Sequence, residues 1–362
     1  MTAAERGLLL LCCPLGEADA QVLTMAQFRT LSVRAHAQTS RPADPLRELT
    51  ARDVQALGYG ADAAARIAGL LARERRLEEY LTAMHRHGFD AVTRISPAYP
   101  PAISEKMGMS APPVLFTLGD QALLQRRCVA LVGSRALQAP GRRFAEAVGR
   151  LAASEGYVLA SGGANGADSA AQAACLAAGG SVIVFTAGRL LDCAAHARVL
   201  YVSEGGCELP FSTPRAMSRN HLIHAMGEKT LVAQCACGAG GTWHGTLDNL
   251  RAGWSPVFVN DDGSDGAQAL CARTGLDAVF FGPAGAGAEN VGGIAARTAS
   301  IPGLRAKFDR IAGGGLSSAR FLCNLVIAFQ LIIAYNDYNA EVKGGPRFYR
   351  HKRRVPAIGS AG

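Results

Sequence analysis

Two arginines stand beside glycine-containing or polar segments in this chain of 362 residues. Arg135 closes the segment VGSR, residues 132–135, which follows an apolar run. Arg219 begins the segment RNHLI, residues 219–223, in which Arg219 and Asn220 precede a predicted helix. A guanidinium group binds a phosphate through two parallel N–H donors, and the free N–H groups at the start of a helix also bind anions. These segments favour a phosphate site. The alternative is that Gly133 only permits a tight turn and Arg135 faces solvent.

Two further segments carry glycine and hydroxyl groups. SGGANGAD, residues 161–168, has three glycines that allow the backbone to approach a ligand closely, and GAGGT, residues 238–242, offers N–H groups and a hydroxyl. Asp168 lies near a predicted helix start, where capping the helix is a simpler interpretation than catalysis. The predicted phosphate-binding residues are Gly133, Ser134, Arg135, Ser161, Gly162, Gly163, Asn165, Gly166, Asp168, Arg219, Asn220, Gly240, Gly241 and Thr242.

These segments do not match the common nucleotide-binding motifs. Residues 133–135 read GSR instead of starting G-x-G-x-x-G, and the next apolar run ends in Ser-Gly-Gly, not in an acid that would bind a ribose. No Walker A lysine, Ser-His-Asp set or carboxylate pair stands out. Cys235 and Cys237 with His244 lack a second cysteine pair at zinc spacing. We therefore expect no metal, no cofactor and no catalytic residue.

The surrounding pattern predicts a parallel sheet that places these segments at one edge. Residues 1–85 have helical periodicity, and the glycine-containing turn in LGYGADAAARI, residues 57–67, allows either a small packed helical domain or a helix-hairpin-helix. Residues 86–125 form a proline-rich connector. Between residues 126 and 282, apolar runs alternate with helical stretches, which is typical of a sheet covered by helices on both faces. The predicted strands are CVALVG, YVLASG, SVIVFTA, RVLYVSE, KTLVAQ, SPVFVN and DAVFF.

Composition limits the class of protein and its partner. Apolar residues make up 49% of the chain and charged residues 18%, which is typical of a globular protein, and the net charge of +8 favours a polyanionic partner. We find no signal peptide, and ten irregularly spaced cysteines then indicate reduced thiols in the cytoplasm. The apolar segment 321–335 is shorter than a membrane span and is predicted to be a buried or partner-facing helix. The basic tail after residue 342 is either solvated or an auxiliary contact to nucleic acid.

The order of motifs resembles the DprA/Smf family of DNA-processing proteins. The motifs that carry the resemblance are Tyr-Pro at 99–100, PPVLFTLG at 112–119, VGSR at 132–135, SGGANGAD at 161–168, SEGG at 203–206, RNHLI at 219–223 and GGT at 240–242. The resemblance implies an α/β, extended Rossmann-like, doubly wound and mostly parallel sheet, preceded by a small helical domain like a sterile alpha motif. With the irregular basic C-terminal extension, the predicted domains span residues 1–88, 89–285 and 286–362.

The resemblance also implies a function. It implies a non-enzymatic, homodimeric protein that binds single-stranded DNA and loads a RecA-type recombinase during natural transformation or recombination. The chain departs from the family pattern at Gln172, where histidine is usual, and at His221, where arginine is usual, and a C-terminal winged helix is not visible. The alternatives are a nucleotide-binding sensor and a nucleoside-monophosphate phosphoribohydrolase, and the missing glutamate after Thr242 counts against the enzyme.

Overall fold

The computed structural model describes residues 1–17, 20–38, 49–274, 279–283 and 294–297. The chain divides into two units, Met1–Ala299 and Ser300–Gly362, and all of the described residues belong to the first. The predicted apolar helix at 321–335 and the basic tail lie outside the described residues, and of the predicted C-terminal extension only residues 294–297 are described. Within those residues, no helix combines the length and apolar character needed to cross a membrane.

The N-terminal region is helical, as its periodicity predicts. Its helices are α1 (Ala3–Cys12), α2 (Met25–Gln38), α3 (Ala51–Ala56), α4 (Ala61–Leu71) and α5 (Glu74–Arg86). Thr2 with Glu5 and Thr50 with Asp53 form capping boxes that start α1 and α3. The stretch 61–88 divides at Arg73, whose guanidinium donates to the carbonyl of Cys13 at 2.9 Å and also to that of Leu10. This side chain holds the end of α1 against the turn between α4 and α5.

One ten-stranded sheet runs through the rest of the described chain, in the order β1-β2-β6-β5-β4-β3-β7-β8-β9-β10. The seven strands from β6 to β9 in that order pair in parallel, and β1, β2 and β10 are antiparallel to their neighbours. All seven predicted strands are confirmed. They are β3 (Cys128–Val132), β4 (Val158–Gly162), β5 (Ser181–Phe185), β6 (Val199–Glu204), β7 (Thr230–Val232), β8 (Val257–Asn260) and β9 (Val279–Pro283).

The predicted connector at 86–125 is not a simple connector. It contains β1 (Phe89–Thr93), α6 (Pro101–Met107), the 3-10 turns η1 (Gly108–Ser110) and η2 (Gln121–Gln125), and β2 (Val114–Leu118). The prolines stand where elements begin, because Pro101 needs no N–H bond in the first turn of α6 and Pro113 directly precedes β2. A further short strand, β10 (Ile294–Arg297), pairs with β9.

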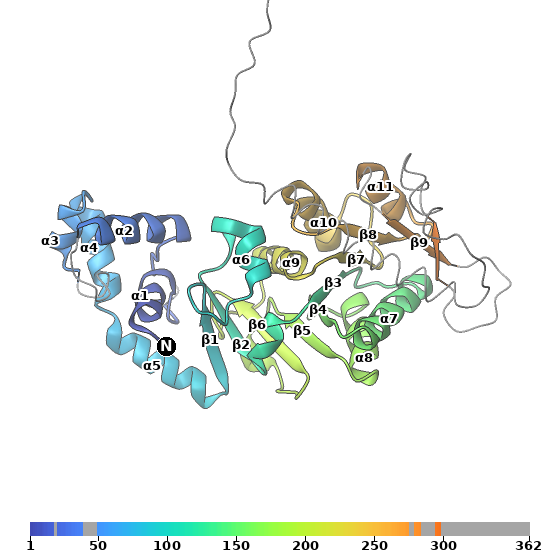
Figure 1. The fold of residues 1–362 in the computed structure, drawn as a ribbon, viewed down its shortest axis with the longest axis horizontal. Coiled ribbons are helices and arrows are strands. Elements are labelled where there is room, and N and C mark those ends of the chain that lie inside the picture. The colour runs from blue at the N-terminus through green and yellow to red at the C-terminus, as the bar shows by residue number, and fades with distance from the viewer. Residues whose placement is uncertain (18–19, 39–48, 275–278, 284–293, 298–362) are drawn as a thin grey trace, which may run out of the picture. The chain divides into compact units, whose positions relative to one another are not determined.

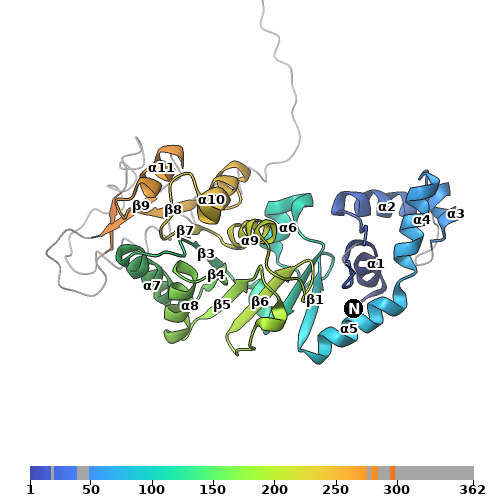
Figure 2. The same cartoon turned by 180° about the vertical axis from the view of Figure 1, so that it is seen from behind.

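Helices cover both faces of the sheet, as expected for a doubly wound fold (Figure 1). On one face lie α7 (Ala139–Ser154) and α8 (Ala167–Ala177). On the other lie α6, α9 (Thr213–Met226), α10 (Gly240–Ala252) and α11 (Asp265–Thr274), which share one apolar core with the strands (Figure 2). The turn η3 (Leu190–Asp192) joins β5 to β6. The predicted fold class is therefore confirmed for the described residues.

The N-terminal helices share a second apolar core with the outer strands. Side chains of α1, α4 and α5 pack against Phe89, Phe116 and Leu118 of β1 and β2. The ring of Tyr80 on α5 meets the ring of Phe116 edge-on, with centroids 6.1 Å apart. The structure places these helices in the same unit as the sheet, and the predicted domain boundaries at 88 and 285 stay predictions.

The strand order reverses between β3 and β7. The chain moves from β3 outward to β4, β5 and β6, then returns through α9 to place β7 on the other side of β3. The loop after β3 leads to α7 on one face of the sheet, and the loop after β7 leads to α10 on the other face (Figure 1). In open α/β sheets, ligands bind in the crevice at this point.

Candidate phosphate-binding site

The loops after β3 and β4 interlock through their glycines. The carbonyl of Ser134 accepts a hydrogen bond from the backbone N–H of Ala167 at 3.2 Å. Gly166 has φ +89°, and a Cβ there would lie 2.4 Å from the carbonyl oxygen of Ser134 and 2.5 Å from that of Arg135. A Cβ on Gly133 would lie 2.4 Å from the Cβ of Ala167. Only glycine allows the two loops to approach this closely.

The loop after β7 joins them through Gln234. Its carbonyl accepts from the backbone N–H of Ser134 at 2.9 Å, and its side-chain Oε1 accepts from that of Gln138 at 2.8 Å. Gln138 is the N-cap residue of α7 and has no capping side-chain bond of its own. The amide of Gln234 therefore fixes both the turn after β3 and the start of the following helix.

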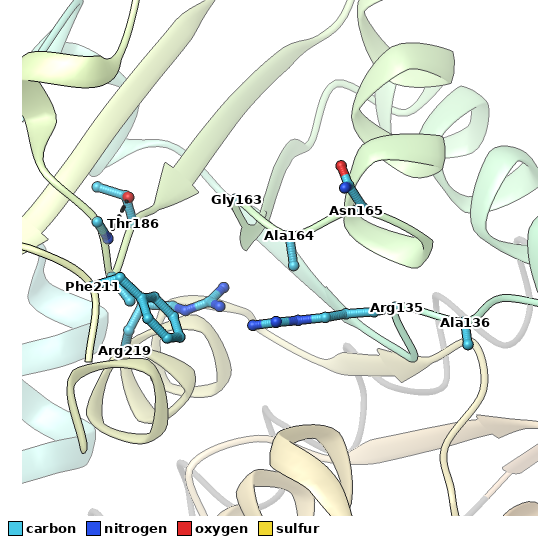
Figure 3. A pocket seen from close by; sticks show the side chains of 10 residues that line it. Arg135, Ala136, Gly163, Ala164, Asn165, Thr186, Phe211 and Arg219 are labelled. Carbon is cyan, nitrogen blue, oxygen red and sulfur yellow. Dashed lines mark hydrogen bonds between the residues drawn. The ribbon is translucent and has the colours of Figure 1, made fainter. Parts of the chain in front are cut away.

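Arg135 and Arg219 face the same cavity from different elements (Figure 3). Arg135 is exposed on the loop after β3, whereas Arg219 comes from α9 and is only 7% exposed. The guanidinium of Arg135 lies 5.9 Å from the ring centroid of Phe211, whose residue is 56% exposed. The structure thus places two guanidinium groups and one exposed aromatic ring together.

Two adjoining cavities, of about 670 and 450 Å³, meet at these side chains and together form what we call the cleft. Both are lined by Arg135, Ala164, Phe211 and Arg219. The larger extends toward the loop after β5, with Thr186, and the smaller toward the start of α10. Of the predicted residues, those that line the cleft are Gly133, Ser134, Arg135, Gly163, Asn165, Asp168, Arg219, Asn220, Gly240, Gly241 and Thr242.

Asp168 forms a buried ion pair with Arg219. Its Oδ2 lies 3.8 Å from Nη1 of Arg219, and the two side chains are 8% and 9% exposed. Burial raises the pKa of Asp168 to about 6, although the positive charge of Arg219 and the N–H of Ala164 oppose the shift. Burial also lowers the pKa of Arg219, while the charge of Asp168 partly offsets that effect. Protonated Asp168 thus favours the folded state, and this contribution to stability is lost as the pH rises through about 6.

Asp168 does not cap α8, contrary to the simpler interpretation of the sequence. The N-cap residue of α8 is Gly166, without a capping side-chain bond, and Asp168 accepts from the N–H of Ala164 at 3.3 Å. The position of Arg219 depends in turn on Gly162, because a Cβ at that residue would lie 1.3 Å from Nη1 of Arg219. Within the described residues, Nε of Arg219 is buried and has no hydrogen-bond partner.

Arg219 and Asn220 lie inside α9 and not ahead of it, so this part of the prediction is wrong. The helix begins at Thr213, because the side chain of Ser212 caps it and Pro214 suits its first turn. Asn220 projects from α9 and donates from Nδ2 to the carbonyl of Gly241 at 3.1 Å. This bond holds the glycine-rich start of α10 beside the cleft.

Three predicted residues do not line the cleft, namely Ser161, Gly162 and Gly166. Ser161 is fully buried, and its Oγ accepts from Nε2 of Gln172 at 2.6 Å. Gln172 also donates to the carbonyl of Gly162 at 2.5 Å. Gln172, one of the two departures from the family pattern, therefore braces the end of β4 from α8.

His221, the other departure, belongs to a separate cluster. Its Nε2 lies 3.1 Å from Oδ2 of Asp248, and its ring centroid lies 5.0 Å from that of Trp254. His221 lines neither cavity. In this chain, the side chain at position 221 joins α9 to α10.

Among the cleft residues that were not predicted, Phe211 is an exposed aromatic side chain. It lies between Pro210 and Ser212 in the segment that leads from β6 to α9. An aromatic residue among prolines and hydroxyl residues, close before a helix start, was the available signal. The described residues also hold no group of three or more His, Cys, Asp and Glu side chains arranged to bind a metal ion.

The fold and the position of the cleft are those of a Rossmann-like protein with a ligand crevice at the reversal of strand order. Residues 90–275 match the family model of DNA recombination-mediator protein A. The match covers half of the chain, and the chain belongs to this family. No curated protein matches the chain.

Solved structures of DNA processing proteins are similar to this chain. DNA processing protein A (DprA) from Streptococcus pneumoniae is 23% identical, with a TM-score of 0.54 over 71% of this chain and 94% of that chain. A structure that describes a single-stranded DNA binding mode of DNA processing protein A from Helicobacter pylori is 22% identical, with a TM-score of 0.43 over 51% of this chain and 87% of that chain.

Proposed function

We propose that this chain binds single-stranded DNA in the cleft between the loops after β3, β4, β5 and β7. The observation that carries the proposal is the convergence of Arg135 and Arg219 on one cavity. A phosphodiester placed between them can accept hydrogen bonds from both guanidinium groups. The glycine-rich start of α10 adds backbone N–H donors on the other side of the smaller cavity.

The exposed ring of Phe211 favours binding of single-stranded DNA over double-stranded DNA. Proteins that bind single strands without sequence preference combine a cationic groove with aromatic rings on which unpaired bases stack. Phe211 is exposed, lies at both cavities and is near Arg135. In a duplex the base faces are covered by their neighbours, so this ring has no base to stack on.

We propose a binding site and not a catalytic one. In the phosphoribohydrolase alternative, the loop reads Gly-Gly-x-Gly-Thr-x-x-Glu, whereas Thr242 is here followed by Trp243, His244 and Gly245, so the glutamate is missing. The sensor alternative requires a free mononucleotide to compete with DNA for the cleft. Competition by a mononucleotide therefore tests the sensor, and analysis of reaction products tests the enzyme.

The cellular role that we propose is recombination mediation, in which the chain passes a bound strand to a RecA-type recombinase. Support comes from membership in a family described as recombination mediators. Homodimer formation, a role in natural transformation and a cytoplasmic location belong to the same proposal.

A salt titration with single-stranded and double-stranded oligonucleotides tests the proposed function. We expect tighter binding of single strands, with log K falling by about 0.7 per log unit of salt for each phosphate contacted. A nucleoside monophosphate serves as competitor, and its products are examined by chromatography. A flat salt response with monophosphate competition would support the sensor, and release of the free base would support the enzyme.

Binding is expected to tighten as the pH falls through about 6, because Asp168 then loses the charge that offsets Arg219. A unit charge about 10 Å from a phosphate contributes about 1.7 kcal/mol at an effective dielectric constant of 20, or roughly tenfold in affinity. Oligonucleotide affinity measured between pH 5 and 7.5 checks this.

Asp168→Asn is expected to bind more tightly than wild type at pH 7.5, with a flattened pH profile. His221→Asn is the control, because it replaces another ionisable side chain, on α9, and His221 lines neither cavity. If the profile of wild type is flat, or if His221→Asn removes it, Asp168 is not the group responsible.

A further inference from the structure

The segment between β6 and α9, residues 205–212, carries Phe211 and is called the Phe211 loop. On one side, Phe211 lines the cleft. On the other side, Gly205 and Leu209 line a third cavity of about 550 Å³, whose walls include Cys13 of the N-terminal region and Met25 of α2. Since the loop lies between cavities, apolar packing alone does not fix the position of its aromatic ring.

Arg215, in the first turn of α9, ties the Phe211 loop to the neighbouring loops. Its Nη2 donates to Oγ of Ser203 at 2.9 Å, at the end of β6. Its Nη1 lies within hydrogen-bond distance of three carbonyl oxygens, those of Ala187 at 2.6 Å, Leu209 at 2.7 Å and Pro210 at 2.7 Å. The last of these residues directly precedes Phe211, so Arg215 holds the backbone from which the ring projects.

Tyr80 reaches the same loop from the N-terminal helices. Its hydroxyl donates to Oε2 of Glu208 at 2.8 Å. Its ring is held by the edge-on contact with Phe116 described above. A side chain on α5 therefore fixes the middle of a loop whose far end lines the cleft.

We propose that Arg215 and Tyr80 are positioning residues for Phe211, through which the N-terminal helical region sets the affinity of the cleft for unpaired bases. The inference rests on the proposed function, since it assigns Phe211 a stacking role. Neither Arg215 nor Tyr80 lines the two cavities of the cleft. Their effect is transmitted through the Phe211 loop.

The test is a double-mutant cycle between Tyr80→Phe and Phe211→Ala, read out as affinity for a fluorescent oligothymidylate. Tyr80→Phe removes one hydroxyl and keeps the ring packing, and we expect binding to weaken about two- to threefold. In the Phe211→Ala background, which itself binds about tenfold more weakly, Tyr80→Phe is expected to have no further effect. Arg215→Lys is expected to behave in the same way with a larger loss, because lysine cannot reproduce the planar fork.

Tyr157→Phe is the matched control, because it also removes one hydroxyl, which donates to Glu228. Tyr157 directly precedes β4, so it lies at the amino ends of the parallel strands, whereas the cleft lies at their carboxyl ends. It is expected to bind as wild type. Hydrogen exchange of residues 205–212 without DNA gives a second readout, in which Tyr80→Phe is expected to exchange faster than wild type.

Additive losses in the cycle, or unchanged exchange in Tyr80→Phe, would overturn the inference. Absence of oligonucleotide binding by wild type would instead refute the proposed function. The exchange experiment still reports on the Phe211 loop in that case, so the two failures are distinguishable.

Discussion

Replacing Arg135 with alanine is expected to weaken single-stranded DNA binding by about 10- to 100-fold. A hydrogen bond to a charged partner contributes about 1.5–3 kcal/mol, and Arg135 lines both cavities of the cleft, where its guanidinium can donate such bonds to a phosphate. Because its side chain is exposed, stability should change little. Fluorescence anisotropy with an oligothymidylate across a salt series measures the loss, and the salt slope should fall by about 0.7.

Arg75→Ala provides a matched control for this prediction. Arg75 lies on α5 with a side chain that is 93% exposed, and it lines neither cavity of the cleft. Its removal lowers the net charge by the same amount and is expected to leave affinity nearly unchanged. Equal affinities of Arg135→Ala and Arg75→Ala at every salt concentration would contradict the placement of DNA in the cleft. Arg219→Ala is a poorer first test, because it leaves Asp168 buried without its partner.

Gly166→Ala is expected to lower the free energy of unfolding by about 2–5 kcal/mol. The backbone there has φ +89°, which costs a non-glycine residue about 1–3 kcal/mol, and the added Cβ would press on the carbonyl oxygens of Ser134 and Arg135. Urea denaturation followed by circular dichroism measures the change. We also expect weaker DNA binding by the folded fraction, because the clash displaces the loop that carries Arg135.

Gly156→Ala separates backbone strain from steric clash as causes of the lower free energy of unfolding. Gly156 has φ +74°, and a Cβ there meets no atom within 4 Å. Its substitution adds backbone strain without a clash and is expected to cost about 1–3 kcal/mol, less than Gly166→Ala, with DNA binding unchanged. Equal destabilisation by the two substitutions would show that the interlocked loops tolerate a side chain at position 166.

The sequence predicted the central sheet because its signal is local. Buried parallel strands such as β3 and β5 are nearly continuous apolar runs, and each is followed by a helical stretch. From this alternation it also follows that Gly133, Gly163 and Gly240 lie at one edge. The loops could therefore be grouped without knowledge of the strand order, and the structure places all three glycines at the cleft.

The features that were missed depend on tertiary contacts. β1 and β2 have prolines nearby, and β2 becomes a strand because it pairs with β6, which is about 80 residues away in sequence. The ion pair of Asp168 with Arg219 joins α8 to α9, and no local pattern shows that Gly162 leaves room for it. Phe211 was missed because a single exposed aromatic residue in a loop has no periodicity.

The burial of Arg219 beneath Gly162 has a consequence for the kinetics of binding. A side chain held by Asp168 and surrounded by protein has already lost its rotamer freedom on folding, so a bound phosphate meets a fixed guanidinium without further ordering cost. Exposed Arg135 keeps its freedom and meets an approaching strand first. Arg135 should then mainly govern the association rate and its salt dependence, whereas Arg219 should mainly govern how long a captured strand stays.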